Sequence, residues 1–191
     1  MKTPQDKRRF IWVIDDADSI IHVNDAWLAF AQENDAPELT EDRVLNHSLW
    51  SFIVGQDTSY IYKQIFDRVR KGTKSPVIPF RCDAPDRRRF MEMHLSLLPD
   101  NAIQFLAVIL HQEPRQSVDF LGTPVDRSGE LVEICSWCKK VFIPELGWRE
   151  LEEAIEPLNL FEPGSMPRMT HTICPTCYDS LEQELGLTYM P

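Results

Sequence analysis

Residues 89–111 read Arg89-Phe-Met-Glu-Met-His-Leu-Ser-Leu-Leu98, then Pro99-Asp100-Asn101, then Ala102-Ile-Gln-Phe-Leu-Ala-Val-Ile-Leu-His111. Apolar residues alternate with polar ones along most of the first run, and the second run is apolar almost throughout. Both patterns are typical of strands, and Pro-Asp-Asn is a turn of the right length to pair them. The sequence therefore predicts two antiparallel strands here.

Further strands are predicted on either side of this hairpin. Val77 to Cys82 precedes the turn Asp83-Ala84-Pro85-Asp86 and predicts a third strand in the same antiparallel run. Near the N-terminus, Phe10 to Ile14 and Ser19 to Val23 are β-rich runs separated by a short polar turn. A strand pair is therefore expected to open the fold.

Two helices are expected between these groups of strands. Asn24 is a suitable N-cap for a short helix that ends near Asn34. A longer helix is predicted from about Asp57 to Lys71, because apolar residues recur there at helical spacing and Gly72 supplies a stop.

This order of elements resembles a PAS domain over about residues 9–113. The resemblance rests on Phe-Ile-Trp-Val-Ile-Asp at 10–15, on Ile21-His-Val-Asn24 leading into Ala26-Trp27, and on the turn from Arg81 to Pro85 before Arg87-Arg88-Arg89. It implies an α+β fold with an antiparallel sheet and helices packed on one face. It also implies a bacterial sensor protein that encloses a small molecule or uses its sheet to pair with a partner, as in a homodimer.

Two cofactors found in PAS domains are not expected here. Haem-binding members commonly take a histidine from the long helix, and Asp57 to Lys71 contains none. The photoactive flavin motif needs a cysteine on a mid-domain helix, and none occurs between Thr40 and Gly55. The remaining histidines of this region, His22, His47 and His94, are expected to have plain structural roles.

A ligand pocket is a hypothesis for the PAS-like region. Its candidate lining is Trp12, Trp27, Phe30, Trp50, Phe66, Phe80 and Arg81. The alternative interpretation is that the aromatic residues are simply the core, since large rings dominate any small core. Arg81 could face a carboxylate ligand, but an ion pair with Asp83 is the favoured prediction. Arg87, Arg88 and Arg89 are interpreted as a solvated turn.

The chain is expected to divide into a PAS-like domain (1–113), a linker (114–130) and a cysteine-rich module (131–191). Proline, glycine and serine interrupt the patterning in the linker. Four of the five cysteines follow it, and Cys82 stands alone before it. The net charge of the 191 residues is −10, and the module has four basic against ten acidic residues. This balance argues against nucleic-acid binding and favours a basic protein partner.

The four clustered cysteines form the strongest chemical signal. Cys135-Ser-Trp-Cys138 and Cys174-Pro-Thr-Cys177 are separated by 35 residues. Four thiolates at about 2.3 Å complete the closed tetrahedron of a structural zinc site. The same ligands could hold iron, and a redox-responsive site is a further alternative. A closed site of this kind has no open position for a substrate.

Residues 133–185 also resemble a cysteine-rich module appended to bacterial PAS and response-regulator proteins. The resemblance rests on Ile134 to Lys140, Gly147-Trp148, Leu151-Glu152 and Thr170-His171-Thr-Ile-Cys-Pro-Thr-Cys177, in which Thr172 replaces a common glycine. His171 is expected to hydrogen-bond a thiolate, and the alternative is that it serves as a metal ligand itself. Helices predicted from about Trp148 to Leu158 and from Pro175 to Gly186 make this small zinc-stabilised module mostly helical.

No motif of a phosphate-binding loop, serine hydrolase or zinc protease is present. Asp15 and Asp16 interrupt the apolar run after the basic N-terminus, so no export signal is supported. The longest apolar run, Ala102 to Leu110, is shorter than the ~20 residues of a membrane helix. We therefore expect a cytoplasmic, non-catalytic sensory or adaptor protein that signals by protein contact. A thiol redox switch and, less favoured, a zinc-finger nucleic-acid binder are the alternatives.

Overall fold

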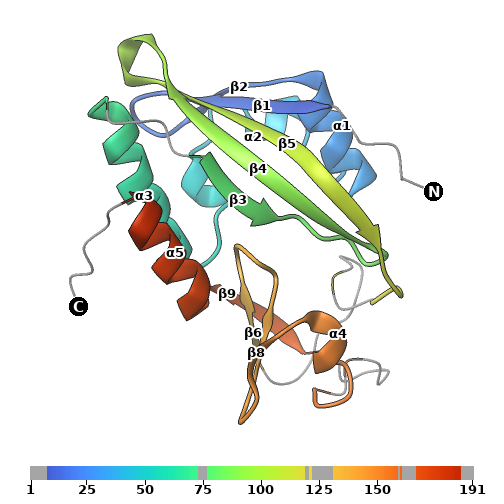
Figure 1. Ribbon diagram of the computed structural model, residues 1–191. Helices are drawn as coiled ribbons and strands as arrows, with labels where there is room; N and C mark the ends of the chain where they lie inside the picture. The colour runs from blue at the N-terminus through green and yellow to red at the C-terminus, as the bar shows by residue number, and fades with distance from the viewer. Residues whose placement is uncertain are drawn as a thin grey trace.

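A computed structural model of the chain describes residues 8–72, 77–118, 121, 131–158, 160 and 167–185. In residues 8–114 it contains the following elements: β1 (Arg9–Ile14), β2 (Ile20–Val23), α1 (Asp25–Glu33), α2 (Glu41–Val44), η1 (Leu49–Ser51), α3 (Gln56–Arg70), β3 (Val77–Arg81), β4 (Arg87–Leu97), η2 (Pro99–Asn101) and β5 (Ile103–Pro114). The strands form one sheet in the order β2-β1-β5-β4-β3, with every pair antiparallel. The helices lie on one face of this sheet (Figure 1). The PAS-like architecture predicted from the sequence is confirmed.

The core of this part lies between α3 and the sheet. Ile61, Ile65 and Phe66 of α3 are almost completely buried against Leu95 and Phe105 of the central strands. The predicted N-cap is also present, since the Asn24 side chain accepts a hydrogen bond from the Trp27 amide at 3.0 Å. Helical periodicity and strand alternation thus bury the residues expected from the sequence.

The second part contains β6 (Leu131–Cys135), β7 (Val141–Ile143), β8 (Gly147–Arg149), α4 (Leu151–Ala154), β9 (Arg168–Thr172) and α5 (Pro175–Leu185). Its four strands form a second sheet in the order β8-β7-β6-β9, in which β6 and β9 are parallel. The prediction of a mostly helical module is therefore wrong. Of the two predicted helices, only that beginning at Pro175 has the expected extent.

The predicted helix from Trp148 to Leu158 fails at its start because Trp148 belongs to a β-hairpin. Trp148 pairs with Phe142 across β7 and β8, and the two rings are 5.7 Å apart. Gly147, with φ of +77°, begins β8 in a conformation that suits glycine. Helix α4 begins only at Leu151 and ends at Ala154.

The predicted linker is described only at residues 114–118 and 121, and the rest of it lies outside the described residues. Val118 is fully buried and packs with the core of the second sheet, and its amide donates to the Pro85 carbonyl at 3.0 Å. The Arg115 amide donates to the Asp86 carbonyl. The described linker residues therefore contact both parts of the molecule, and the division into two domains at this segment stays a prediction.

No helix in the described residues is long and apolar enough to cross a membrane.

Candidate functional site: a four-cysteine cluster docked on the sheet

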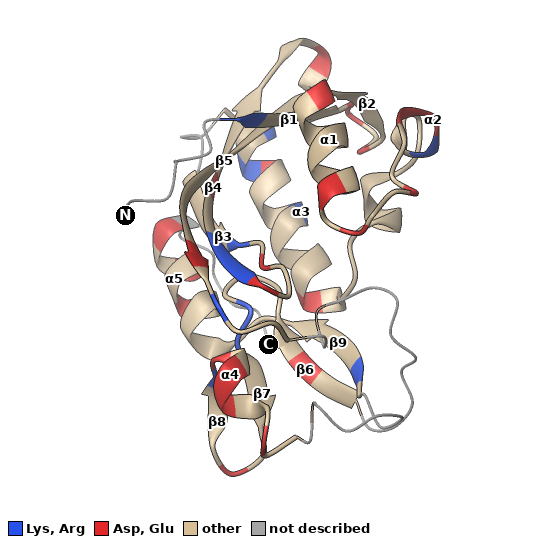
Figure 2. Ribbon diagram, turned by 90° about the vertical axis from the view of Figure 1, so that its right-hand side faces the viewer, with Lys and Arg blue, Asp and Glu red and all other residues tan. Residues whose placement is uncertain are grey.

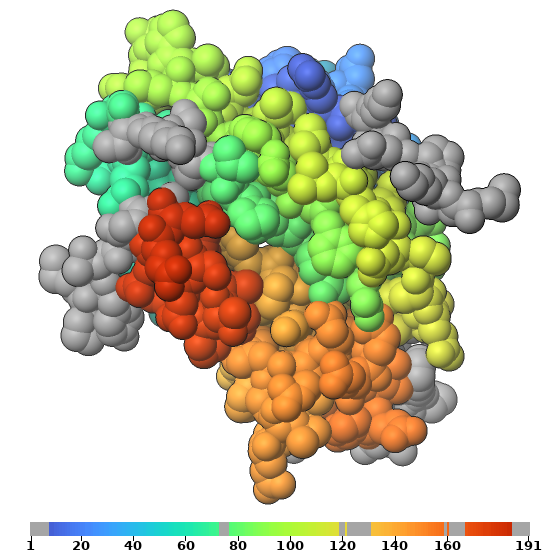
Figure 3. All heavy atoms as spheres, in the orientation of Figure 1, coloured from blue at the N-terminus to red at the C-terminus, as the bar shows by residue number. Residues whose placement is uncertain are grey.

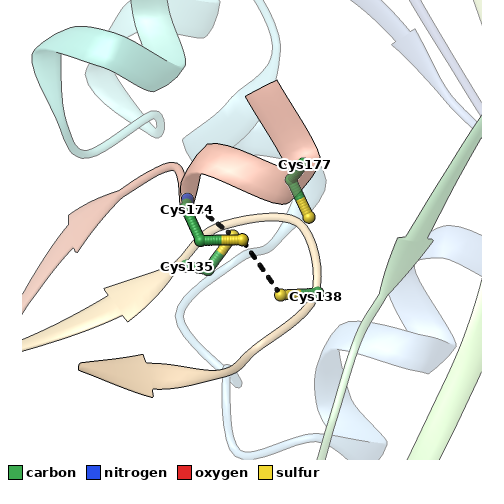
Figure 4. Close-up of side chains that lie close together, drawn as sticks. All are labelled: Cys135, Cys138, Cys174 and Cys177. Carbon is green, nitrogen blue, oxygen red and sulfur yellow. Dashed lines mark hydrogen bonds between the residues drawn. The ribbon is translucent and has the colours of Figure 1, made fainter. Parts of the chain in front are cut away.

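The structure brings the four predicted cysteines together. Cys135 ends β6, Cys138 follows in the turn toward β7, and Cys174 and Cys177 stand just before and inside the first turn of α5 (Figure 4). Because β6 and β9 are parallel neighbours, both chain segments reach the cluster from the same end of the sheet. Because of this pairing, the two Cys-x-x-Cys pairs meet although 35 residues separate them in the sequence.

The geometry of the sulfur atoms fits a tetrahedral metal site. All four Sγ atoms lie within 4.8 Å of one another, and Cys138 Sγ lies 3.7 Å from Cys174 Sγ. Sulfurs bound at about 2.3 Å around one ion are about 3.8 Å apart. The cluster can therefore hold one metal ion through its four thiolates.

The environment of the cluster differs between its members. Cys135 and Cys174 are buried, whereas Cys138 and Cys177 are half-buried. The Cys174 amide donates to Cys135 Sγ at 3.4 Å, which favours a charged sulfur. Hydrogen bonding with the other three cysteines, that with Cys135 first, raises the pKa of the Cys177 thiol. A divalent cation would reverse this effect, because it lets all four sulfurs ionise.

His171 does not make the predicted hydrogen bond to a thiolate through Nδ1. This ring nitrogen is buried and has no hydrogen-bond partner within the described residues. Burial, followed by the nearby Lys139, lowers the pKa of His171. Instead, His171 lines a cavity of about 220 Å³ together with Thr58, Tyr62 and Trp137.

Residues 135–138, here called the cysteine loop, contact both the five-stranded sheet and α3. The Arg81 amide at the end of edge strand β3 donates to the Trp137 carbonyl at 2.7 Å. Two further hydrogen bonds join α3 to the module. The hydroxyls of Thr58 and Ser136 lie 2.8 Å apart, and Thr172 Oγ1 donates to Asp57 Oδ2 at 2.7 Å.

An ion-pair network also joins the two parts. Arg81 pairs with Asp83, as predicted, and also with Glu150 of the module at 2.7 Å. Arg115 lies between Asp83 and Glu152, at 3.3 and 3.4 Å. The side chains of Asp83, Arg115 and Arg81 are only 1%, 4% and 8% exposed. These charges are thus compensated by one another rather than by water.

The interpretation of Arg87, Arg88 and Arg89 as a solvated turn is wrong for two of the three. Arg88 pairs with Glu152 of the module at 2.7 Å. Arg89 is buried, with its guanidinium 5.2 Å from the centre of the Phe30 ring. Only Arg87, which pairs with the exposed Asp86, behaves as predicted. Glu152, the partner of Arg88, lies far away in the sequence, and Phe30, the partner of Arg89, lies on α1.

A separate cavity of about 190 Å³ lies inside the PAS-like part and is almost wholly apolar. Two of the seven predicted pocket residues, Trp12 and Trp27, line it. Residues absent from the prediction complete the lining: Ile20, Val23, Leu39, Val44, Leu49, Phe52, Ile53, Tyr62 and Phe105. Tyr62 could have been found from its position four residues before Phe66 on the buried side of α3.

The other five predicted pocket residues lie elsewhere. Phe66 is fully buried behind Phe105 and Tyr62, and Trp50 packs on Phe66 while its indole nitrogen donates to Asp18 at 2.9 Å. Phe30 packs against Phe10 in a second cluster. Phe80 and Arg81 line a separate groove, and Phe80 also lines the cavity that contains His171.

Tyr62 connects the apolar cavity to the cysteine cluster. Its side chain lines the cavity, and its ring lies 5.3 Å from that of Trp137, between Cys135 and Cys138. Burial raises the pKa of Tyr62 to about 12, so the phenol is neutral at physiological pH.

No family model matches the sequence, and no curated protein matches it. Three solved structures with a similar fold are the following. The PAS domain of the Cronobacter turicensis quorum-sensing receptor RpfR, in complex with C12:0, is 12% identical over 56% of this chain and 99% of that chain, with a TM-score of 0.41. The photoactive yellow protein domain of the Rhodospirillum centenum sensor histidine kinase Ppr is 13% identical over 54% and 87%, with a TM-score of 0.39. The PAS domain of Bordetella pertussis BvgS is 17% identical over 56% and 74%, with a TM-score of 0.36.

Proposed function

We propose that the protein is a cytoplasmic, non-catalytic sensory or adaptor protein of the bacterial PAS type. A small apolar ligand occupies the cavity lined by Trp12 and Trp27, and a structural zinc module carries the response to a protein partner. The observation that carries this proposal is the position of Tyr62, which contacts both the cavity and Trp137 of the cysteine loop. A ligand that shifts Tyr62 would therefore shift the loop that holds two of the metal ligands.

Zinc is favoured as the ion because four cysteines without an open position are the donor set of structural zinc sites. Such a site holds no water or substrate, which supports a structural rather than catalytic role. Iron remains the alternative ion, since it accepts the same four thiolates.

The charge of the module supports a basic protein partner and gives no support to nucleic-acid binding. Acidic residues, red in Figure 2, lie on α4 and on the turn between β7 and β8. They include Glu145 and Glu153, which are exposed. Phosphate backbones would be repelled by such a surface, whereas a basic protein would be attracted. Homodimerisation through the PAS-like part belongs to the proposal as well.

Elemental analysis and native mass spectrometry of the purified protein test the proposal together. We expect one zinc ion per chain, a co-purified apolar molecule and, in the native spectrum, a dimer. The Cys135→Ser variant is expected to lose the metal, whereas Cys82→Ser, which changes the cysteine outside the cluster, is expected to keep it. A metal-free parent protein, or a Cys135→Ser variant as stable as the parent, would refute the structural zinc site.

A thiol redox switch is the second candidate, because Cys138 and Cys177 are half-buried rather than sealed. In that case mild peroxide would oxidise the cysteines and expel the ion. Metal content and thiol titration before and after peroxide decide between the two functions. A site that keeps its zinc under oxidant excludes the switch.

A further inference from the structure

A groove of about 420 Å³ lies where α5, strands β3 to β5 and the cysteine loop meet (Figure 3). Its walls are mainly apolar and include Phe80, Phe90, Met91, Leu110, Trp137 and Leu181. It is separate from the cavity inside the PAS-like part, which shares none of its lining residues.

Two of the four clustered cysteines border this groove. Cys138 and Cys177 line it, while Cys135 and Cys174 are buried and do not. Cys177 shares one face of α5 with Leu181 and Glu184, at helical spacing, and this face lines the groove. A molecule in the groove would therefore lie beside two sulfur atoms of the cluster.

We propose that the groove binds neutral, apolar α,β-unsaturated carbonyl compounds and that Cys138 and Cys177 are their sites of covalent attachment. The proposal rests on the metal site proposed above, because cysteines bound to a metal are thiolates, and the thiolate is the nucleophilic form. It adds a chemical class of input to the proposed sensory function.

The reaction balances without a further oxidant or reductant. A sulfur lone pair forms a bond to the β-carbon of the compound, and the π electrons of the carbon–carbon double bond move to the carbonyl oxygen as an enolate. The α-carbon then takes a proton from water. A sulfur that held the ion would give up its bond to the metal in the same step. Once Cys138 and Cys177 had both reacted, only Cys135 and Cys174 would hold the ion, and their thiolates would take protons from water if it left as the divalent cation.

The charges lining the groove favour a neutral compound over an anionic one. Among the described residues that line the groove, Arg81 is the one basic residue, and its guanidinium is already paired with Asp83 and Glu150. Glu184 adds a further carboxylate to the wall. A fatty acid would thus meet a carboxylate without a free cation, whereas an aldehyde or ketone carries no charge to repel.

Cys82 is not a competing site. Burial raises the pKa of its thiol, so it is protonated near neutral pH, and it is absent from the lining of the groove. It therefore serves as an internal reference for non-specific alkylation.

The test compares trans-2-nonenal with acrolein on the metal-loaded full chain. Adducts are located by peptide mass spectrometry, and each rate is divided by the rate of the same aldehyde with free glutathione. Each methylene buried in the groove strengthens binding roughly fourfold. We expect the corrected rate at Cys138 and Cys177 to be at least about tenfold higher for nonenal.

Two variants at exposed leucines of the same sheet provide the matched comparison. Leu110→Glu places a charge in the groove and is expected to abolish the preference for nonenal, whereas Leu97→Glu, outside the groove, is expected to preserve it. Equal corrected rates for the two aldehydes, or adducts mainly at Cys82, would overturn the inference. Elemental analysis of the same samples reports the proposed metal separately: a metal-free protein refutes the metal site, whereas equal corrected rates on a protein that contains the metal refute the groove.

Discussion

A Cβ atom on Gly55 would lie 2.5 Å from the carbonyl oxygen of His171. Gly55 precedes α3, and His171 lies in β9, so this contact joins the helix of the PAS-like part to the strand that leads into Cys174. Gly55 also has a φ of +99°, which side chains with a Cβ rarely adopt. This contact between the two parts thus requires glycine for two separate reasons.

Gly55→Ala is expected to destabilise the protein more than Gly72→Ala. Both glycines have positive φ, at a cost of roughly 1–2 kcal/mol for alanine, but a Cβ on Gly72 meets nothing within 4 Å. The clash at Gly55 adds roughly 1–3 kcal/mol. Urea unfolding of the two variants measures the difference, and equal losses would show that the contact with His171 is unimportant.

Asp83→Asn is expected to cost roughly 3–5 kcal/mol, because it leaves Arg81 and Arg115 buried beside a neutral side chain. Asp86→Asn is the control. Its partner Arg87 is exposed, and loss of such a pair costs roughly 0–1 kcal/mol. Denaturant midpoints of both variants check the prediction, which fails if the two substitutions have the same effect.

Because Tyr62 is buried, the protein is expected to lose stability at alkaline pH. Its pKa of about 12 in the folded protein lies above the ordinary value of 10.0, because burial disfavours the charged phenolate. The contribution of this pKa shift to the free energy of unfolding is therefore complete below pH 10 and is lost as the pH rises to about 12. Stability measured across this range should fall less steeply in Tyr62→Phe than in the parent; identical slopes would contradict the assignment.

Removal of the metal by a chelator is expected to unfold the second sheet and leave the first intact. The small core around Val132, Ile134 and Leu151 has few residues, so metal binding contributes much of its folding free energy. Hydrogen exchange should rise in β6 to β9 and stay low in β4 and β5. The Cys82→Ser variant should respond as the parent does, and a module that remains protected without metal would contradict the prediction.

The local parts of the structure were predictable from the sequence, and the non-local ones were not. The β4–β5 hairpin, the Asn24 cap and α3 follow from patterns within a single segment. The pairing of β6 with β9 joins residues 37 positions apart, as Ile134 and His171 do, and leaves no periodic signal. The strands β7 and β8 have three residues each, too few to show alternation.

The same distinction holds for the candidate site. The spacing of the cysteines sufficed to predict their cluster, because each pair is a local turn and the ion has a fixed number of ligands. The partners of Arg88 and the contact of Tyr62 with Trp137 depend on how the two parts dock. Docking is decided by surface complementarity between distant segments, which the order of residues in either one does not reveal.

The hydrogen bond from the Arg81 amide to the Trp137 carbonyl also occupies an amide group at the edge of the five-stranded sheet. β3 is an edge strand, and an edge with free amide groups can recruit strands from other molecules. Pro79 has no amide hydrogen to donate to another strand at this edge, and the cysteine loop covers the end of β3. Loss of the metal is therefore expected to expose a site for intermolecular β-pairing, and aggregation of the metal-free protein would begin at β3.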